Sequence, residues 1–254
     1  MSLKIYHLHF AQSDRIVWLC EELSDLIPNF KYDLHVYPRG MPDSEGKKAL
    51  LSLHPSGTAP TMVDSTVSPP VTMTESQAIL TYILSIHGQG HLTRTPSVGP
   101  LAYAQYLYWL SFANGSFQAF LNANLVADTL AAQAQISPET LAQNPTYQHF
   151  QQRTKNHLSQ YDSRLAESRY LAGDDFSAAD IMNTYALTVF RGIYPMDLTE
   201  YPNVLRWLKE ITSRKAYVRT MEKAEDGLPA MVDAKVPQLG FEVLLSMKSW
   251  TTAF

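Results

Sequence analysis

The stretch that decides the fold is Leu53-His54-Pro55-Ser56-Gly57-Thr58-Ala59-Pro60-Thr61-Met62, followed by Glu75-Ser76-Gln77-Ala78-Ile79. Proline cannot donate to a strand ladder, so Pro60 is expected at a turn or at the start of a strand. If the Ala59–Pro60 bond is cis, the N–H and C=O of Ala59 face whatever lies beside the strand. Glu75-Ser76 opens an apolar helix, whose first N–H groups and Ser76 hydroxyl would face a carboxylate. Each feature alone is also ordinary turn and capping chemistry, but together they predict a site for a small peptide.

Composition narrows the class of protein. The chain has 254 residues, of which 45% are hydrophobic and 17% charged, as in a globular protein. The net charge of −4 offers no basic surface for nucleic acid. The single Cys20 excludes an internal disulfide, and its apolar neighbours predict a buried structural thiol. No signal pattern or apolar run of membrane-spanning length is present, so we expect a cytoplasmic protein with no membrane partner.

The first third of the chain alternates strands and helices. Hydrophobic periodicity predicts a strand at 3–10, a helix carrying Ile16 to Leu23, a strand at 30–37 and a short helix at 43–53. A hairpin of two strands after Pro60 and near 71–73 follows, and the helix from Ser76 closes the unit. This β-α-β-α-β-β-α order predicts an α/β, thioredoxin-like domain at residues 1–87.

The rest of the chain is predicted to be all-helical. Gly and Pro residues at 88–100 mark a linker, and residues 101–228 form a helical-bundle domain. Its expected helices cover 100–134, 145–168, 177–191, 203–213 and 215–225. Ser177 and Asp180 form a variant capping box, with Phe176 and Ile181 placed to staple the same helix start. The tail at 229–254 is a candidate helix whose apolar face comprises Leu239, Val243, Leu244 and Met247.

Several further motifs follow in a characteristic order. They are Gln12-Ser13-Asp14-Arg15-Ile16-Val17-Trp18-Leu19-Cys20-Glu21-Glu22-Leu23, Tyr108-Trp109-Leu110-Ser111-Phe112-Ala113-Asn114-Gly115-Ser116, Tyr201-Pro202-Asn203 and Arg214-Lys215-Ala216-Tyr217. With the Ala59–Pro60 and Glu75-Ser76 features, they resemble the glutathione S-transferases, and among these a fungal and bacterial serine-type subgroup near the theta class. The resemblance reaches to about residue 228. It implies the two-domain glutathione transferase fold, glutathione as co-substrate, and a homodimer.

The resemblance also implies roles for residues that match the family's glutathione site. Ala59, before Pro60, would pair its backbone with the cysteinyl part of glutathione, and Glu75 and Ser76 would hold the γ-glutamyl end. Gln12 would also line this site. The subgroup often has a lysine two residues before the proline, where this chain has Thr58. A cation for the glycyl carboxylate must then come from elsewhere, with Arg39, Lys47 and Lys48 as the candidates.

The hydroxyl expected to activate the thiol is missing. The enzymes of this family act by lowering the thiol pKa, because the thiolate is the nucleophile. In the serine-type subgroup the activating serine lies four residues before the arginine of the first helix, and here that position is Ala11. Ser13 is the candidate catalytic residue, although it is equally placed to cap the helix. Gln12, through its amide, and Tyr6 are the other substitutes.

Aromatic residues supply a candidate pocket for the second substrate. Tyr108, Phe112, Phe117 and Phe120 follow helical spacing, so most are expected in the core, with the start of the stripe facing the cleft between the domains. The candidate co-substrate pocket comprises Phe10, Tyr108, Phe112 and Asn114. His7, His9 and His54 do not have metal-ligand spacing, so no metal is expected.

Three functions remain open on this evidence. The first is an enzyme that conjugates glutathione thiolate to a small apolar electrophile, or adds it transiently for isomerisation or elimination. The second is a glutathione-binding or regulatory protein of the same fold, which Ala11 favours. The third is a peptide-binding domain without glutathione, which Thr58 favours.

Overall fold

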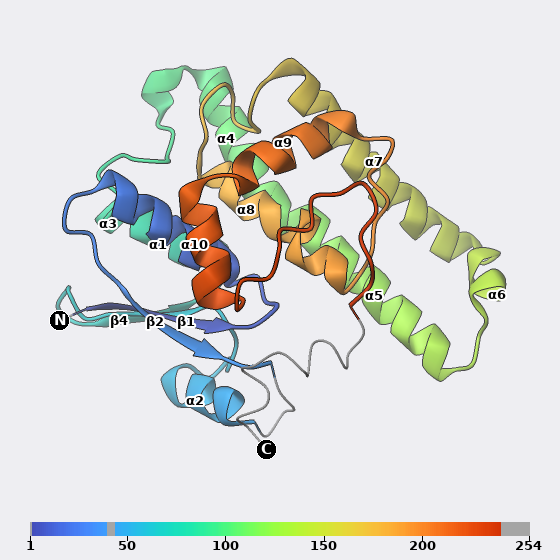
Figure 1. Ribbon diagram of the computed structural model, residues 1–254, viewed down its shortest axis with the longest axis horizontal. Helices are drawn as coiled ribbons and strands as arrows, with labels where there is room; N and C mark the ends of the chain where they lie inside the picture. The colour runs from blue at the N-terminus through green and yellow to red at the C-terminus, as the bar shows by residue number, and fades with distance from the viewer. Residues whose placement is uncertain (1, 40–43, 240–254) are drawn as a thin grey trace.

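The computed structural model describes residues 2–39 and 44–239. Its first part contains β1 (Leu3–Leu8), α1 (Asp14–Leu26), β2 (Asp33–Tyr37), α2 (Glu45–Leu53), β3 (Thr61–Asp64), β4 (Val71–Thr74) and α3 (Ser76–Ile86). The strands form one sheet in the order β2-β1-β3-β4. β1 and β2 are parallel and the other pairs antiparallel. Figure 1 shows α1 and α3 on one side of this sheet and α2 on the other.

The second part is helical. Its α-helices are α4 (Pro100–Phe112), α5 (Gln118–Gln133), α6 (Pro138–Ala142), α7 (Pro145–Glu167), α8 (Ala178–Leu187), α9 (Pro202–Thr212) and α10 (Lys215–Ala224). The long helix predicted at 100–134 is interrupted by one π-helical turn, Ala113–Phe117, which separates α4 from α5. The predicted fold class, a thioredoxin-like domain followed by a helical bundle, is confirmed. In the described ranges, every helix is too short or too polar to cross a membrane.

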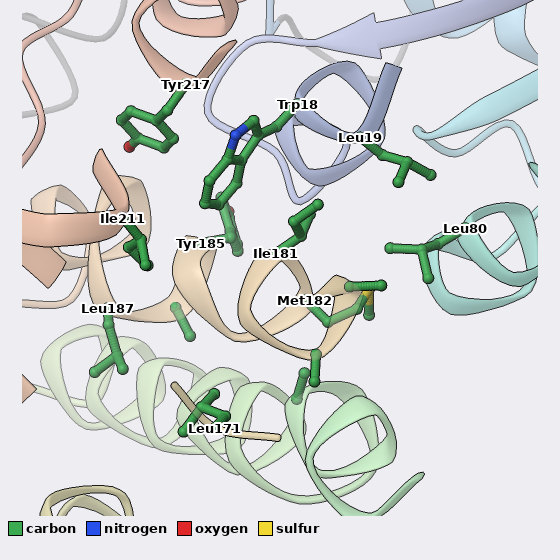
Figure 2. Close-up of a cluster of buried hydrophobic side chains, with 14 of the residues drawn as sticks. Trp18, Leu19, Leu80, Leu171, Ile181, Met182, Tyr185, Leu187, Ile211 and Tyr217 are labelled. Atoms are coloured by element: carbon green, nitrogen blue, oxygen red, sulfur yellow. The ribbon is translucent and has the colours of Figure 1, made fainter. Parts of the chain in front are cut away.

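The core joins the two parts through α1 and α8. Trp18 of α1 points toward Tyr185 of α8, with Tyr217 of α10 beside it, whereas Leu19 points toward Leu80 of α3 (Figure 2). Every residue of α8 is buried, because the helix lies between α1 and α4. The predicted capping box starts α8, and the indole of Trp207 donates to Asp180 at 2.9 Å. α1 therefore packs on the sheet and also against α8 of the helical part.

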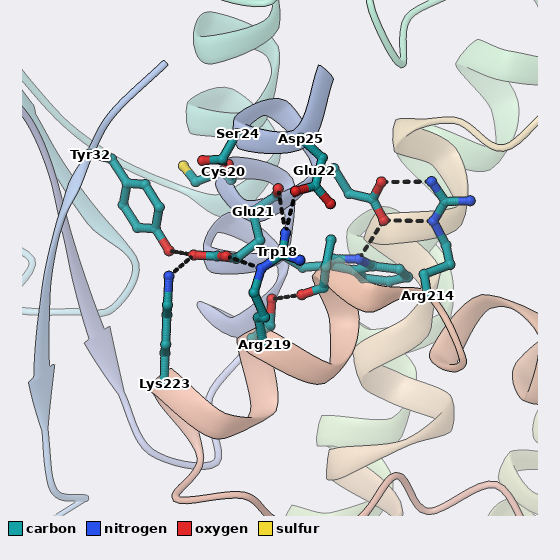
Figure 3. Close-up of polar contacts among 12 residues, drawn as sticks. Trp18, Cys20, Glu21, Glu22, Ser24, Asp25, Tyr32, Arg214, Arg219 and Lys223 are labelled. Atoms are coloured by element: carbon teal, nitrogen blue, oxygen red, sulfur yellow. Dashed lines mark hydrogen bonds and ion pairs between the residues drawn. The ribbon is translucent and has the colours of Figure 1, made fainter. Parts of the chain in front are cut away.

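Polar contacts to two buried glutamates connect Arg214 and α10 to α1 (Figure 3). Glu21 accepts hydrogen bonds from Tyr32, from Arg219 at 2.9 Å and from Lys223 at 2.7 Å. Glu22 forms two 2.6 Å contacts with the guanidinium of Arg214. Both glutamates are buried, because α10 covers them.

A buried arginine is the main side-chain contact of the segment after α10, which also makes backbone hydrogen bonds at Ala234 and Leu239. Arg191 is fully buried and donates to the carbonyls of Met231 at 3.0 Å and Asp233 at 2.9 Å. Burial lowers the pKa of this guanidinium to about 10. Residues 229–239 contain no helix. The rest of the candidate tail helix, including Val243, Leu244 and Met247, lies outside the described residues.

Candidate active site at one end of the sheet

Strand register brings three separate segments to one end of the sheet. Thr61 pairs with Tyr6 in β1 and with Thr74 in β4. The end of β1, the start of β3 and the end of β4 therefore lie side by side. The loop after β1, the Ala59–Pro60 bend and the Glu75-Ser76 helix start each continue from one of these strand ends.

The Ala59–Pro60 bond is cis. Within the described residues, no hydrogen bond takes up the N–H or C=O of half-buried Ala59. Gly57 has φ +55°, and a Cβ there would lie 2.6 Å from the Leu51 side chain, so glycine is required at this turn. The ammonium of Lys47 donates to the Gly57 carbonyl at 2.8 Å. Lys47, one of three predicted cations, thus lies at the bend.

The start of α3 is open to a ligand. Glu75 has φ 73°, is exposed, and precedes the fully buried Ser76. Such a φ is uncommon for a non-glycine residue and marks a constrained position. No acceptor in the described chain takes the N–H groups of Ser76, Gln77 or Ala78. Free N–H groups and the helix dipole are the features that favour an anion at a helix start.

A hydrogen-bonded chain runs from a buried arginine to Ser76. Arg15 Nη1 donates to Asn114 Oδ1 at 2.6 Å, and Asn114 Nδ2 donates to Ser76 Oγ at 2.9 Å. The Ser76 hydroxyl accepts in this contact, so its proton is free to donate to a ligand. Asn114 reaches the site from the π-helical turn, and such turns are frequent at functional sites. The sequence predicted Asn114 near the co-substrate but gave no sign of this link to Ser76.

Arg15 also orients Gln12. Its Nη1 donates to Gln12 Oε1 at 2.9 Å, and because a guanidinium only donates, the NH2 of Gln12 faces away from it. Arg15 is 1% exposed, and its Nε and Nη2 have no hydrogen-bond partner in the described residues. Burial lowers the pKa of Arg15 and raises that of the adjacent Asp14 to about 7. The site therefore contains a poorly neutralised buried cation, which favours an anionic ligand.

The loop after β1 is fixed at Phe10. This residue has φ 53°, and its carbonyl accepts from Arg39 Nη2 at 2.6 Å and from the Tyr185 hydroxyl at 2.9 Å. Arg39 Nε also donates to the His9 carbonyl at 3.2 Å. Two of the guanidinium nitrogens of Arg39 thus bind this loop, whereas Lys47 lies at the Ala59–Pro60 bend.

The geometry does not support the predicted role of Ser13. Its side chain is fully buried, and its hydroxyl lies 2.9 Å from His7 Nδ1 and accepts from the Leu8 N–H at 3.3 Å. It makes no capping bond to α1. Tyr6 lies on the other side of β1, stacked on His35 with ring centroids 4.7 Å apart. Of the three predicted substitutes for the missing serine, Gln12 remains the best placed, because the described contacts leave its NH2 free beside Arg15, whereas Tyr6 lies on the other side of β1.

The predicted co-substrate pocket needs a correction. Phe10 is fully buried and Phe112 is 6% exposed, packed against Phe117 and Tyr161, so neither lines a cleft. Asn114 serves Ser76, as described above. Tyr108 alone of the four is substantially exposed, at 42%. Helical side chains turn inward wherever a neighbouring helix covers them, and the sequence does not reveal which helix does so.

Cys20 does not supply a nucleophile. It is fully buried in α1, and burial raises its pKa far above the ordinary range. Since the chain has no other cysteine, a thiol at this site must come from a ligand.

Comparisons with known proteins agree with this architecture. Residues 144–210 match the family model of the glutathione S-transferase C-terminal domain. Glutathione S-transferase 3 of Schizosaccharomyces pombe is 29% identical over 226 residues, covering 87% of this chain and 88% of the relative. The Escherichia coli disulfide-bond oxidoreductase YghU is 26% identical over 232 residues, covering 85% of this chain and 73% of the relative.

Solved structures share the fold. A glutathione transferase family member from Pseudomonas fluorescens, solved with two glutathione bound, superposes with a TM-score of 0.68 at 19% identity, covering 87% of this chain and 92% of that one. The fold is thus a thioredoxin-like half followed by a helical half, with N–H groups at the start of α3 that are free within the described residues. Residues 144–210 match the glutathione S-transferase C-terminal domain, and most of the chain is similar in sequence to a glutathione S-transferase.

Proposed function

We propose that this protein is a glutathione transferase, which binds glutathione at the end of the sheet and uses its thiolate to attack a small apolar electrophile. The observation that carries the proposal is the open start of α3, where Asn114 leaves the Ser76 hydroxyl proton free for a carboxylate. The similarity to glutathione S-transferases supports the same proposal.

The tripeptide is proposed to lie along the three segments. The backbone of Ala59 pairs with the cysteinyl residue, as its free N–H and C=O allow. Ser76 and the helix start take the γ-glutamyl carboxylate, and exposed Glu75 takes the ammonium. Lys47, whose ammonium donates to the Gly57 carbonyl next to the bend, is proposed to meet the glycyl carboxylate. Arg39 is proposed instead to hold the loop at Phe10.

Activation of the thiol is assigned to Gln12. With Oε1 held by Arg15, its NH2 is directed away from the arginine and can donate to a thiolate. A neutral amide donor and a nearby buried cation both favour the anion, although each acts less directly than a hydroxyl on the thiol. The apolar substrate is assigned to the surface around Tyr108. Ser111, one turn further along α4, contacts Gln77 at the start of α3 at 3.4 Å.

A second candidate function is a glutathione-binding or regulatory protein without chemistry. The burial of the Ser13 hydroxyl, together with Ala11, favours it, because neither position then offers a hydroxyl to the thiol. Thiolate absorbance of the glutathione complex distinguishes the two functions. Formation of thiolate near neutral pH supports the enzyme, and a normal thiol pKa supports the binding protein.

The test of the proposed function combines binding with turnover. Calorimetry measures glutathione affinity, and conjugation with a chlorodinitrobenzene measures activity. We expect Ser76→Ala to weaken binding by about 1–3 kcal/mol, as for a hydrogen bond to a charged group. The control is Ser213→Ala, an exposed serine after α9. Unchanged affinity in Ser76→Ala would remove Ser76 from the site. A disulfide substrate is assayed as well, because one relative is named an oxidoreductase.

A cytoplasmic homodimer completes the proposal. An open hollow along α3, lined by residues including Gln77, Thr81 and Ile86, is proposed to receive the long helices of a second copy. Ile86 is 53% exposed, as expected of a side chain that a partner would cover. A sedimentation mass near the monomer value of 28.6 kDa at micromolar concentration would contradict the dimer.

A further inference from the structure

A buried cluster of two histidines and one glutamate lies next to the loop after β1. His7 and His9 are two residues apart in and just after β1, so their side chains lie on the same side of the sheet. Glu225, directly after α10, meets both of them. Its carboxylate oxygens lie 3.2 Å from His7 Nε2 and 3.3 Å from His9 Nδ1. All three side chains are at most 1% exposed.

The histidine nitrogens in this cluster lack hydrogen bonds. His7 Nε2 and both ring nitrogens of His9 have no hydrogen-bond partner in the described chain, because the contacts with Glu225 are close but poorly directed. Buried polar atoms in native proteins nearly always have a partner, so three orphaned nitrogens in one place require an explanation. A cation between the two rings and the carboxylate would satisfy His7 Nε2 and one nitrogen of His9, since each ring offers it one ligand atom.

We propose that His7, His9 and Glu225 bind one divalent transition-metal ion, with zinc as the metal of matching chemistry. Two imidazoles and a carboxylate are an established zinc donor set. Metal–ligand bonds of about 2.0–2.1 Å at tetrahedral angles place neighbouring ligand atoms about 3.3 Å apart. The two contacts have about this length, each to a different oxygen of Glu225, and one ligand atom from each residue lies within 4.8 Å of the others. In such a site each nitrogen lone pair points at the metal, which accounts for the poorly directed contacts.

The surroundings have the features of an outer ligand shell. Ligating histidines usually donate their second ring nitrogen to a neighbouring oxygen. The Ser13 hydroxyl lies 2.9 Å from His7 Nδ1, the nitrogen that does not face Glu225. The Phe10 N–H donates to both oxygens of Glu225 at 3.1 Å. In this arrangement the Ser13 hydroxyl fixes the orientation of the His7 ring and takes no part in activating the thiol.

The metal would be structural and independent of the glutathione site. It joins the end of α10 to β1 just before the loop at Phe10. The sequence did not predict it, because two histidines at this spacing are weak evidence without the third ligand, which lies more than two hundred residues further along the chain. The expectation of no metal rested on the histidines alone.

The test uses the full chain after removal of metal with a chelator, with glutathione left out because it binds zinc itself. Cobalt(II) is titrated as a spectroscopic probe, and bound zinc is measured by elemental analysis after dialysis. We expect one equivalent of either metal, visible cobalt absorption typical of tetrahedral coordination, and a higher thermal midpoint with zinc. Less than a tenth of an equivalent of zinc retained by wild-type protein would overturn the proposal without reference to any variant.

Variants locate the ion. His9→Gln and Glu225→Gln are expected to abolish the cobalt spectrum and the thermal shift. The control is His149→Gln on α7, which removes an exposed histidine and should change neither. Retention of a full equivalent by a folded His9→Gln variant, or its loss in His149→Gln, would assign the metal elsewhere and refute the site.

Discussion

The hydrogen bonds from Arg15 to Asn114 and from Asn114 to Ser76 predict that the substitution most similar in shape at position 114 is the more damaging one. Asn114→Asp changes the shape of the side chain very little, whereas Asn114→Ala removes most of it. The aspartate could still accept from Arg15, as the amide oxygen does now at 2.6 Å. Its second oxygen would replace the NH2 that donates to Ser76, and an oxygen there can only accept. The Ser76 proton would then turn toward the aspartate and away from the ligand.

The magnitude follows from the contacts that are lost. Asn114→Asp costs the hydrogen bond from Ser76 to the ligand carboxylate, about 1.5–3 kcal/mol for a bond to a charged group. This corresponds to a roughly 10- to 150-fold weaker affinity for glutathione. Repulsion between two carboxylates adds to the loss. Asn114→Ala leaves the Ser76 hydroxyl free to rotate and still donate, so it should cost only about 0.5–1.5 kcal/mol. The conservative variant is therefore expected to bind glutathione more weakly than the truncation.

Calorimetry with glutathione at neutral pH measures both affinities, and thermal unfolding checks that both variants fold. Asn156→Asp, on the exposed side of α7, controls for the added negative charge. The reasoning is refuted if Asn114→Asp binds glutathione as tightly as wild type, or more tightly than Asn114→Ala. Either result would mean that Ser76 does not donate to the ligand.

Three further changes test other parts of the structure. Ala11→Ser is expected to lower the pKa of bound glutathione by supplying a hydroxyl, and an unchanged ultraviolet thiolate titration would contradict this. Glu21→Gln should lower the free energy of unfolding in denaturant by about 1–3 kcal/mol. The substitution removes the buried negative charge that half-exposed Lys223 contacts. Burial alone would raise the pKa of Asp64, but hydrogen bonds from residues including His87 hold it below its ordinary value. The contribution of ionised Asp64 to the free energy of unfolding is thus complete above its unfolded pKa of about 3.9. It is lost as pH falls toward the lower pKa of the folded state. Asp64→Asn should flatten the acid side of a plot of thermal midpoint against pH, and an unchanged slope would be the contrary result.

The elements with strong local signals could be predicted from the sequence. The strand at Leu3–Leu8 alternates buried and half-buried residues, and the helix from Ser76 begins where the pattern predicted. The capping box at Ser177 and Asp180 is present. Each of these depends on residues within a few positions of one another, so periodicity and capping rules are sufficient.

The failures concern contacts between distant segments. Ser13 was a reasonable candidate donor from its place in the loop, but its hydroxyl is turned toward His7 and buried. The π-helical turn that directs Asn114 to Ser76 lies inside an otherwise uniform helical pattern. Spacing along one segment cannot reveal which side chain of another segment supplies a partner.

The arrangement also explains why the first domain of this protein depends on the second. The residues proposed to bind glutathione are almost all in the first domain, yet the loop beside them is held from elsewhere. Tyr185 of α8 binds the Phe10 carbonyl, and Glu225 binds the Phe10 N–H. α1 is buried over nearly its whole first three turns, because α8 and α10 cover the side that the sheet does not. Removing the helical part would expose this apolar surface, free the Phe10 N–H, and leave the Phe10 carbonyl with Arg39 but without Tyr185. Since positive φ values such as 53° at Phe10 persist only where surrounding contacts enforce them, the site geometry is a property of the whole chain.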